Sequence, residues 1–285
     1  MKIIALISFF LIIAITSNSQ SITGKISDAV TGEMLEYVGL GILNTSVGTI
    51  TNDKGEFSLD VKGQPADAII RISMMGYKAQ TFSIEQLLNK QNSIQLVQEP
   101  VQIQEVVVKP SNKFKNIGTT SRSLRGMCGW GGDKRGKGHE IGLKIELGEK
   151  PVLLQKLNIR VHKQSYDSSL FRLHIRNIED EMPNEELLNT NVLVVVTKTK
   201  GWQEIDLSKN YIVLKGNVVL SLEWLKVIGL NDNKLIRMNS DKQATANVLF
   251  SVKKGQGTLF SKWGVEAKWR KMENESPGIY LRVEE

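Results

Sequence analysis

Apolar and polar residues alternate along most of the chain after residue 20, and this period-two pattern predicts β-strands. The alternation is regular in Glu56–Val61, in Leu157–His162 and in Phe171–Arg176. Turn residues such as Gly, Asn and Asp separate these stretches. Only 85–90 and 184–188 have the composition of short helical turns. The pattern therefore predicts an all-β chain.

The glycine and turn residues between positions 22 and 97 form an ordered string. It runs Gly24-x-Ile26-x-Asp28-x-x-Thr31-Gly32, then Gly48-Thr49-x-Thr51-Asn52-x-x-Gly55-x-Phe57-x-Leu59, then Gly76-Tyr77. This string resembles the carboxypeptidase regulatory-like domain, which implies a small transthyretin-like β-sandwich. The segment Ile103–Val108 is similar to the one that follows this domain in Bacteroidetes envelope proteins, including TonB-dependent receptors. The resemblance implies a domain that accompanies peptidases without supplying their zinc site.

A second series of short strands is expected between residues 139 and 285. The segments Phe171–Ile178, Gly201–Leu207 and Gly216–Trp224 resemble jelly-roll accessory domains of bacterial surface proteins. The resemblance implies a jelly-roll-like β-sandwich that binds a glycan or a protein partner. Strand alternation in Phe171–Arg176 puts three apolar side chains on one face and three basic ones on the other, which we expect to be solvated.

The first residues have the features of a secretory signal peptide. Lys2 precedes an apolar run from Ile3 to Ile15, and Ser17 and Ser19 fit the two small positions before a cleavage site after Ser19. The run is shorter than the roughly 20 residues that span a bilayer. We expect an exported protein of the periplasm or the outer cell surface, with a retained membrane anchor as the alternative. The expected divisions are a signal peptide at 1–19, a regulatory-like domain at 20–98, a linker at 99–138 and a jelly-roll-like domain at 139–285.

The net charge of +7 comes from one segment. Residues 109–138 hold eight basic side chains, one acidic side chain and seven glycines, a composition typical of an extended, mobile linker. Such a linker is attracted to anionic membrane surfaces or acidic glycans, unless it is only a solvated connection. Export excludes nucleic acid as its partner. The candidate contact residues are Arg122, Arg125, Lys134, Arg135 and Lys137.

Motifs for catalysis are absent from the sequence. The chain has three histidines, no His-Glu-x-x-His motif, no Gly-x-Ser-x-Gly elbow and no phosphate loop. Its single cysteine, Cys128, cannot form an internal disulfide. Neighbouring strands could bring His162 and His174 together as a metal pair, but solvated histidines are the default interpretation. We therefore expect no catalytic residue, no metal and no cofactor.

Two tryptophans are the candidate ligand-binding residues. Trp263 and Trp269 flank a polar stretch and could stack on a sugar, although simple packing is the alternative. The sequence predicts a non-catalytic, exported envelope accessory or binding protein that presents a β-sandwich to a glycan or protein partner. Two alternatives stay open. One is a truncated relative of the N-terminal regions of TonB-dependent receptors, and the other is a hydrolase whose site is assembled from distant residues.

Overall fold

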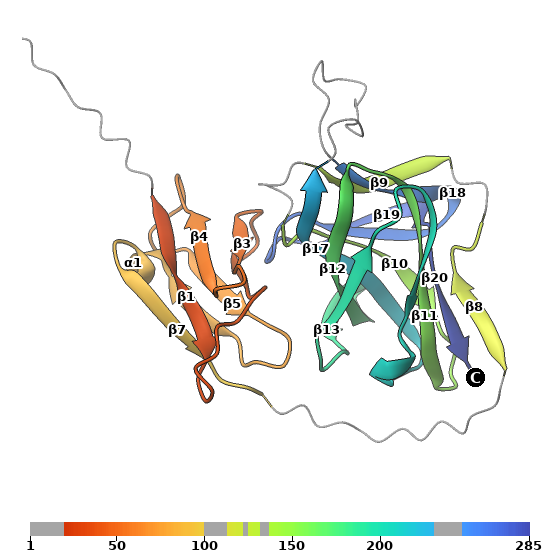
Figure 1. Cartoon of the computed structure of the whole chain (residues 1–285), viewed down its shortest axis with the longest axis horizontal. Coiled ribbons are helices and arrows are strands. Elements are labelled where there is room, and N and C mark those ends of the chain that lie inside the picture. Colours follow the sequence, from red (N-terminus) through yellow and green to blue (C-terminus); the bar gives the residue numbers. More distant parts are fainter. Residues whose placement is uncertain (1–19, 100–112, 122–124, 132–136, 231–246) are drawn as a thin grey trace, which may run out of the picture.

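The computed structural model describes residues 20–99, 113–121, 125–131, 137–230 and 247–285, in two all-β domains (Figure 1). The predicted signal peptide at 1–19 and the segment Ile103–Val108 lie outside the described residues. No helix in the described part is long and apolar enough to cross a membrane. The predicted all-β fold is confirmed.

The N-terminal domain packs two small sheets against each other. One has the order β4-β1-β7 and the other β3-β2-β5-β6. Alternating side chains such as Phe57 and Leu59, or Ile94 and Leu96, point into a shared apolar core. The elements are β1 Ser21–Asp28, β2 Gly39–Ile42, β3 Gly48–Ile50, β4 Glu56–Asp60, β5 Ile69–Ser73, β6 Gln80–Ser83, α1 Ile84–Leu87 and β7 Gln91–Leu96.

The C-terminal domain is a larger sandwich built from one continuous strand ladder. Its path runs β13-β12-β17-β10-β18-β11-β20-β8, and β9, β14, β15, β16 and β19 pair with strands of that path. Its core contains Trp130, Phe171 and Phe250, whose ring centroids lie 4.9 to 5.7 Å apart. The elements are β8 Phe114–Gly118, β9 Gly126–Gly131, β10 Glu140–Glu146, β11 Val152–Gln164, β12 Tyr166–Glu179, β13 Met182–Glu186, β14 Val192–Val196, β15 Gly201–Asp206, η1 Ser208–Asn210, β16 Val213–Leu214, β17 Asn217–Leu230, β18 Asn247–Lys262, β19 Arg270–Pro277 and β20 Ile279–Glu284.

Part of the expected linker 99–138 belongs to this sandwich. Strand β8 pairs with β20, and β9 pairs with β18. A Cβ atom on Gly129 would lie 2.1 Å from the Val248 carbonyl oxygen, so the glycine lets two backbones approach closely. Trp130 from the same strand is buried in the core. The prediction of a mobile linker is therefore wrong for these two strands, because their glycines serve packing.

The short helical turn expected at 184–188 is also wrong. Residues Met182–Glu186 form β13, which turns back and pairs antiparallel with β12. The Glu186 carboxylate accepts a hydrogen bond of 2.9 Å from the Ile175 backbone N–H. Pairing with the neighbouring strand thus overrides the weak local helix preference. The other expected turn is present as α1.

A loop at residues 263–269 joins the two domains. Val265 is buried, and Cβ atoms built on Gly39 and Gly48 would lie 2.7 and 3.3 Å from its side chain. The Asn44 backbone N–H donates a 2.9 Å hydrogen bond to the Glu266 carbonyl. These contacts require residues without side chains in β2 and β3. Gly39 and Gly48 therefore allow the loop to pack closely against the N-terminal domain.

Candidate functional site

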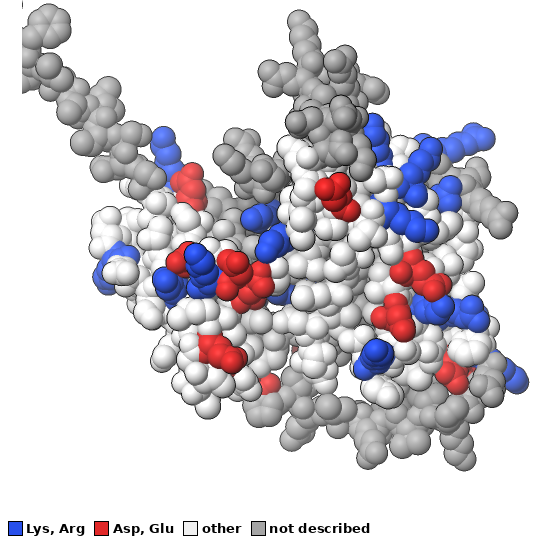
Figure 2. Space-filling view, viewed as in Figure 1, with Lys and Arg blue, Asp and Glu red and all other residues white. Residues whose placement is uncertain are grey.

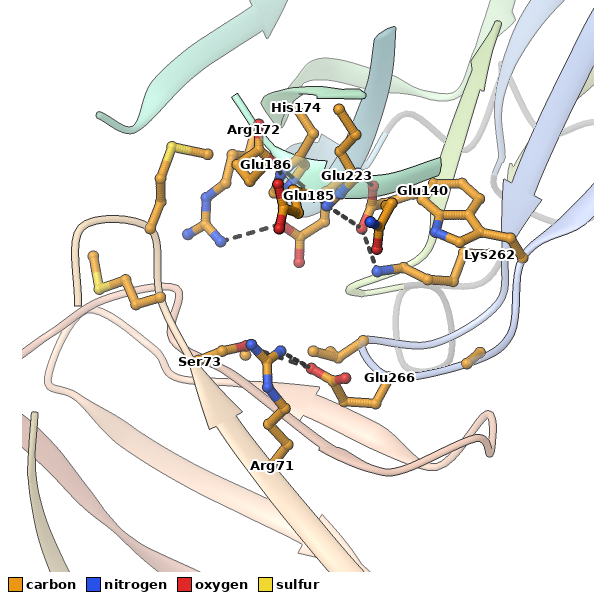
Figure 3. Close-up of a pocket in the computed structure, with 18 residues that line it drawn as sticks. Arg71, Ser73, Glu140, Arg172, His174, Glu185, Glu186, Glu223, Lys262 and Glu266 are labelled. Atoms are coloured by element: carbon orange, nitrogen blue, oxygen red, sulfur yellow. Dashed lines mark hydrogen bonds and ion pairs between the residues drawn. The ribbon is translucent and has the colours of Figure 1, made fainter. Parts of the chain in front are cut away.

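A cleft of about 500 Å³ lies where the two domains meet (Figure 3). The N-terminal domain contributes Gly39 of β2, the end of β5 and the residues after it. The C-terminal domain contributes β10, β12, β13, β17, the end of β18 and the loop that follows it. The lining residues used below are Arg71, Ser73, Glu140, Arg172, His174, Arg176, Glu185, Glu186, Glu223, Lys262, Glu266 and Trp269.

The basic face of β12 points into this cleft and is not solvated. Arg172 and His174 are only 3% and 8% exposed. The alternation itself is as predicted, since Phe171, Leu173 and Ile175 fill the core on the opposite face. The expectation of a solvated face is wrong because the N-terminal domain and strand β13 cover it.

Glu140 on β10 is the centre of one half of a buried charge network. Its carboxylate accepts hydrogen bonds of 2.6 Å from Arg176 and 2.8 Å from the Ser221 hydroxyl. The Lys262 ammonium lies 2.6 Å from it. Burial opposes ionisation, but the Arg176 and Lys262 charges hold the pKa of Glu140 well below its ordinary value. Glu140 is therefore an anion clamped by two cations.

His174 links the other half of the network. Its Nδ1 lies 2.6 Å from the Glu186 carboxylate, and its Nε2 lies 3.0 Å from that of Glu223. Arg172 also donates to Glu223, at 3.1 Å. A histidine donates from both ring nitrogens only when it is protonated. The geometry therefore calls for a positively charged His174.

The pKa values of these groups follow from the same contacts. Burial and the Arg176 charge lower the pKa of His174, but the Glu140, Glu186 and Glu223 carboxylates outweigh them and raise it above its ordinary 6.5. Burial raises the pKa of Glu186, but His174 and Arg176 bring it below its ordinary value.

We predict that this network makes the stability of the C-terminal domain depend on pH in both directions. The His174 contribution is complete below pH 6.5 and is lost as the pH rises through the higher folded-state pKa. The carboxylate contribution is present above pH 4.5 and is lost as the pH falls through the lowered pKa values. Urea unfolding measured from pH 5 to pH 9 should show a falling free energy on the alkaline side. His174→Gln should flatten that fall, and parallel curves for both proteins would contradict the assignment.

Both domains close the cleft with charged groups. Arg71 from β5 pairs with Glu266 at 2.9 Å, and the Ser73 hydroxyl lies 3.4 Å from the same carboxylate. Arg172 donates a 2.7 Å hydrogen bond to the Tyr37 carbonyl of the N-terminal domain. The cleft is therefore complete only when the two domains are docked.

The structure separates the two candidate tryptophans. Trp269 lines the cleft, where the cationic groups of Arg176 and Lys262 lie 5.4 and 5.2 Å from its ring centroid. Trp263 is 41% exposed, and its ring packs edge-on against His139 at 5.2 Å. It is not among the residues that line the cleft. Of the pair, only Trp269 belongs to the site.

The other candidates lie elsewhere. Arg125 and Lys137 are exposed, whereas Arg122, Lys134 and Arg135 fall outside the described residues. His162 is exposed on β11. Burial raises the pKa of the Cys128 thiol to about 12. Within the described ranges, no group of three or more His, Cys, Asp or Glu side chains is arranged to hold a metal ion.

Four of the five glutamates that line the cleft were not selected as site residues from the sequence. Glu140, Glu186, Glu223 and Glu266 come from four separate segments. One usable signal was the register of β17, whose residues Ser221 and Glu223 alternate with apolar neighbours as the basic residues of β12 do. When two paired strands both carry polar residues on the same face of the sheet, those residues can form a buried polar network.

One family model matches the N-terminal part of the chain. Residues 22–108 match the model of the CarboxypepD_reg-like domain. No curated protein sequence matches the chain. Two solved structures of the clostridial cysteine protease Cwp84 align with it at 8% sequence identity. One, determined after propeptide cleavage, has a TM-score of 0.40, with 93% of this chain and 70% of that chain covered.

The second Cwp84 structure contains the cysteine protease and lectin-like domains of this surface-layer-associated protein of Clostridium difficile. It has a TM-score of 0.39, with 87% of this chain and 59% of that chain covered. Similarity this low carries no functional information. The family match confirms the resemblance read from the glycine and turn residues. The N-terminal part of this chain, at residues 22–108, is a CarboxypepD_reg-like domain.

Proposed function

We propose that this is a non-catalytic, exported envelope protein whose interdomain cleft binds a neutral, hydroxyl-rich ligand, a glycan. The observation that carries the proposal is the cleft itself. It combines donors and acceptors that are already fixed in place with an aromatic side chain, Trp269. Sites for small polar ligands have this composition, with a few precisely held polar groups beside an apolar surface.

The charges that line the cleft balance. Five glutamates face four Lys and Arg side chains, and protonated His174 supplies the fifth positive charge. An acidic or basic ligand would leave an unpaired charge in this buried setting, which is costly. Hydroxyl groups can instead add hydrogen bonds to carboxylates and guanidinium groups that remain paired. A neutral saccharide therefore fits the cleft better than an ionic ligand.

The ionisation states support a binding role rather than hydrolysis. A glycosidase needs one carboxyl group with a raised pKa that donates a proton. The pKa values of Glu140, Glu186 and Glu223 are all lowered, so all three are anions at neutral pH. This arrangement favours the non-catalytic proposal.

Export and envelope contact are part of the same proposal. The predicted signal peptide would bring the protein to the periplasm or the outer cell surface, and the basic residues Arg125 and Lys137 are exposed for contact with an anionic surface. Cell fractionation combined with N-terminal sequencing tests this part. A mature protein that begins at Gln20 in an envelope fraction is the expected result, and an uncleaved cytoplasmic protein would contradict it.

We predict that Trp269→Ala weakens binding to a neutral polysaccharide by roughly tenfold, because it removes an aromatic surface and the two cation–π contacts that position Arg176 and Lys262. Isothermal titration with residues 20–285 against a mannan, a xylan and a dextran provides the measurement. Tyr211→Asn is the matched control. Tyr211 is an exposed aromatic residue that does not line the cleft, and Asn tolerates its left-handed backbone conformation. Equal affinities of wild type and Trp269→Ala for every neutral probe that binds would contradict the proposal that the cleft is the glycan-binding site.

A further inference from the structure

A second surface with recognition chemistry lies on the outer face of the C-terminal sandwich. Strands β15, β11, β20 and β8 are neighbours there. On β11, Leu157, Ile159 and Val161 face the core, so strand alternation puts Asn158 and Arg160 on the outer face. Trp202 is the register partner of Arg160, and Tyr280 is the register partner of Asn158. We call Trp202, Tyr280, Arg160, Lys198 and Lys200 the outer patch.

The two aromatic rings of the outer patch meet across β11. Their centroids lie 5.0 Å apart with an interplanar angle of 70°. Both side chains are half-buried, and Asn158 beside them is only 4% exposed although it lies on the outer face. The rings therefore form a fixed surface on a rigid sheet, and apolar core residues on the other face hold it in place.

Cationic side chains lie near Trp202 in space or in sequence. The Arg160 guanidinium lies 5.6 Å from the Trp202 ring centroid. Lys198 and Lys200 are exposed in the turn that leads into β15. Figure 2 shows Lys and Arg side chains on this face of the C-terminal sandwich, with Asp and Glu side chains between some of them. On the same sheet face, Glu204 is engaged by Lys156 at 2.6 Å, and among the described residues no carboxylate pairs with Arg160, Lys198 or Lys200.

We propose that the outer patch binds an acidic polysaccharide, with sugar rings against Trp202 and Tyr280 and the sugar carboxylates beside Arg160, Lys198 and Lys200. Charge complementarity selects this ligand class. The patch offers positive charges that have no carboxylate partner in the described structure, whereas the interdomain cleft offers balanced pairs. An aromatic surface beside fixed cations suits a chain that carries both apolar ring faces and negative charges. This site lies apart from the cleft and takes a different class of glycan.

Binding of residues 20–285 to polygalacturonate, with dextran as the uncharged probe, tests the proposal. Wild type should bind polygalacturonate at least about tenfold more tightly than dextran in low salt, with the preference shrinking in high salt. Trp202→Ala should weaken polygalacturonate binding by about tenfold. The double change Lys198→Gln and Lys200→Gln should weaken it several-fold in low salt, whereas the matched change Lys209→Gln and Lys215→Gln should have no effect.

The variants also separate this site from its competitors. Trp269→Ala should leave polygalacturonate binding unchanged, because that residue belongs to the cleft. Equal binding of wild type and Trp202→Ala would overturn the proposal and leave the exposed basic segment as the source of the attraction. Vesicles of phosphatidylglycerol that bind with the same dependence on Trp202 would overturn it in favour of a lipid surface. Failure of the neutral-glycan proposal would appear with dextran, mannan and xylan and would not affect these results.

Discussion

Glu140→Gln should lower the free energy of unfolding of the C-terminal domain by about 3 kcal/mol, because it removes the carboxylate that pairs with buried Lys262 and leaves Arg176 with the more distant Glu186 carboxylate, 3.5 Å away. The Glu140 side chain is 3% exposed, and both cations beside it are nearly buried. Neither Arg176 nor Lys262 can recover full hydration without opening the cleft. Urea unfolding followed by tryptophan fluorescence measures the loss, since Trp130 and Trp224 are buried in this domain.

The control for this prediction is a glutamate on the same strand. Glu146 pairs with Lys144 at 2.9 Å, but its side chain is 71% exposed. Exposed pairs contribute little, so Glu146→Gln should unfold as wild type does. If both variants lost a similar free energy of unfolding, the burial of Glu140 would add no stability beyond that of an exposed pair. The buried network would then not have the stabilising role given to it here.

Gly41→Leu should separate the two domains while each keeps its own fold. A Cβ atom on Gly41 would lie 2.9 Å from the Glu266 backbone nitrogen, so a larger side chain must push the 263–269 loop away. The two main cores are separate clusters, and in the described structure the apolar contacts between the domains are a small cluster of Ile50, Leu225 and Val265 and the packing of Met75 against the C-terminal core. Small-angle X-ray scattering should show a larger radius of gyration for the variant.

Gly63→Asn is the matched control for domain separation. Gly63 lies in the same domain, has φ of +76° and has open space around it, and Asn tolerates that backbone conformation. Its scattering curve should equal that of wild type. An unchanged radius for Gly41→Leu, together with an unchanged thermal transition, would contradict the role given to the loop.

The fold was largely predictable because its signals are local. Alternation at Glu56–Val61 and Phe171–Arg176, and the turn glycines of the first domain, depend on neighbours in sequence. The two strands β8 and β9 were missed because their glycines have two physical explanations. A glycine loosens a free chain, but it also lets strands approach closely, and only the partner strand decides between them.

The site was less predictable because its parts are distant in sequence. Sequence reasoning selected Trp269 and noted the basic alternation that contains His174. It could not tell whether that polar face of β12 meets water or another domain. Glu140 precedes Arg176 by 36 residues, and Glu223 follows Arg172 by 51. Such pairs are set by strand order, which local patterns do not fix.

A pull-down shows whether glycan binding depends on docking of the two domains. Residues 20–285 of wild type and of Gly41→Leu are incubated with peptidoglycan, outer membrane and soluble polysaccharide from the envelope, in low and high salt. Wild type should bind one glycan-containing fraction in both low and high salt, and Gly41→Leu should lose the salt-resistant part of that binding. Salt-resistant binding that Gly41→Leu retains, or wild-type binding that high salt removes entirely, would contradict this prediction.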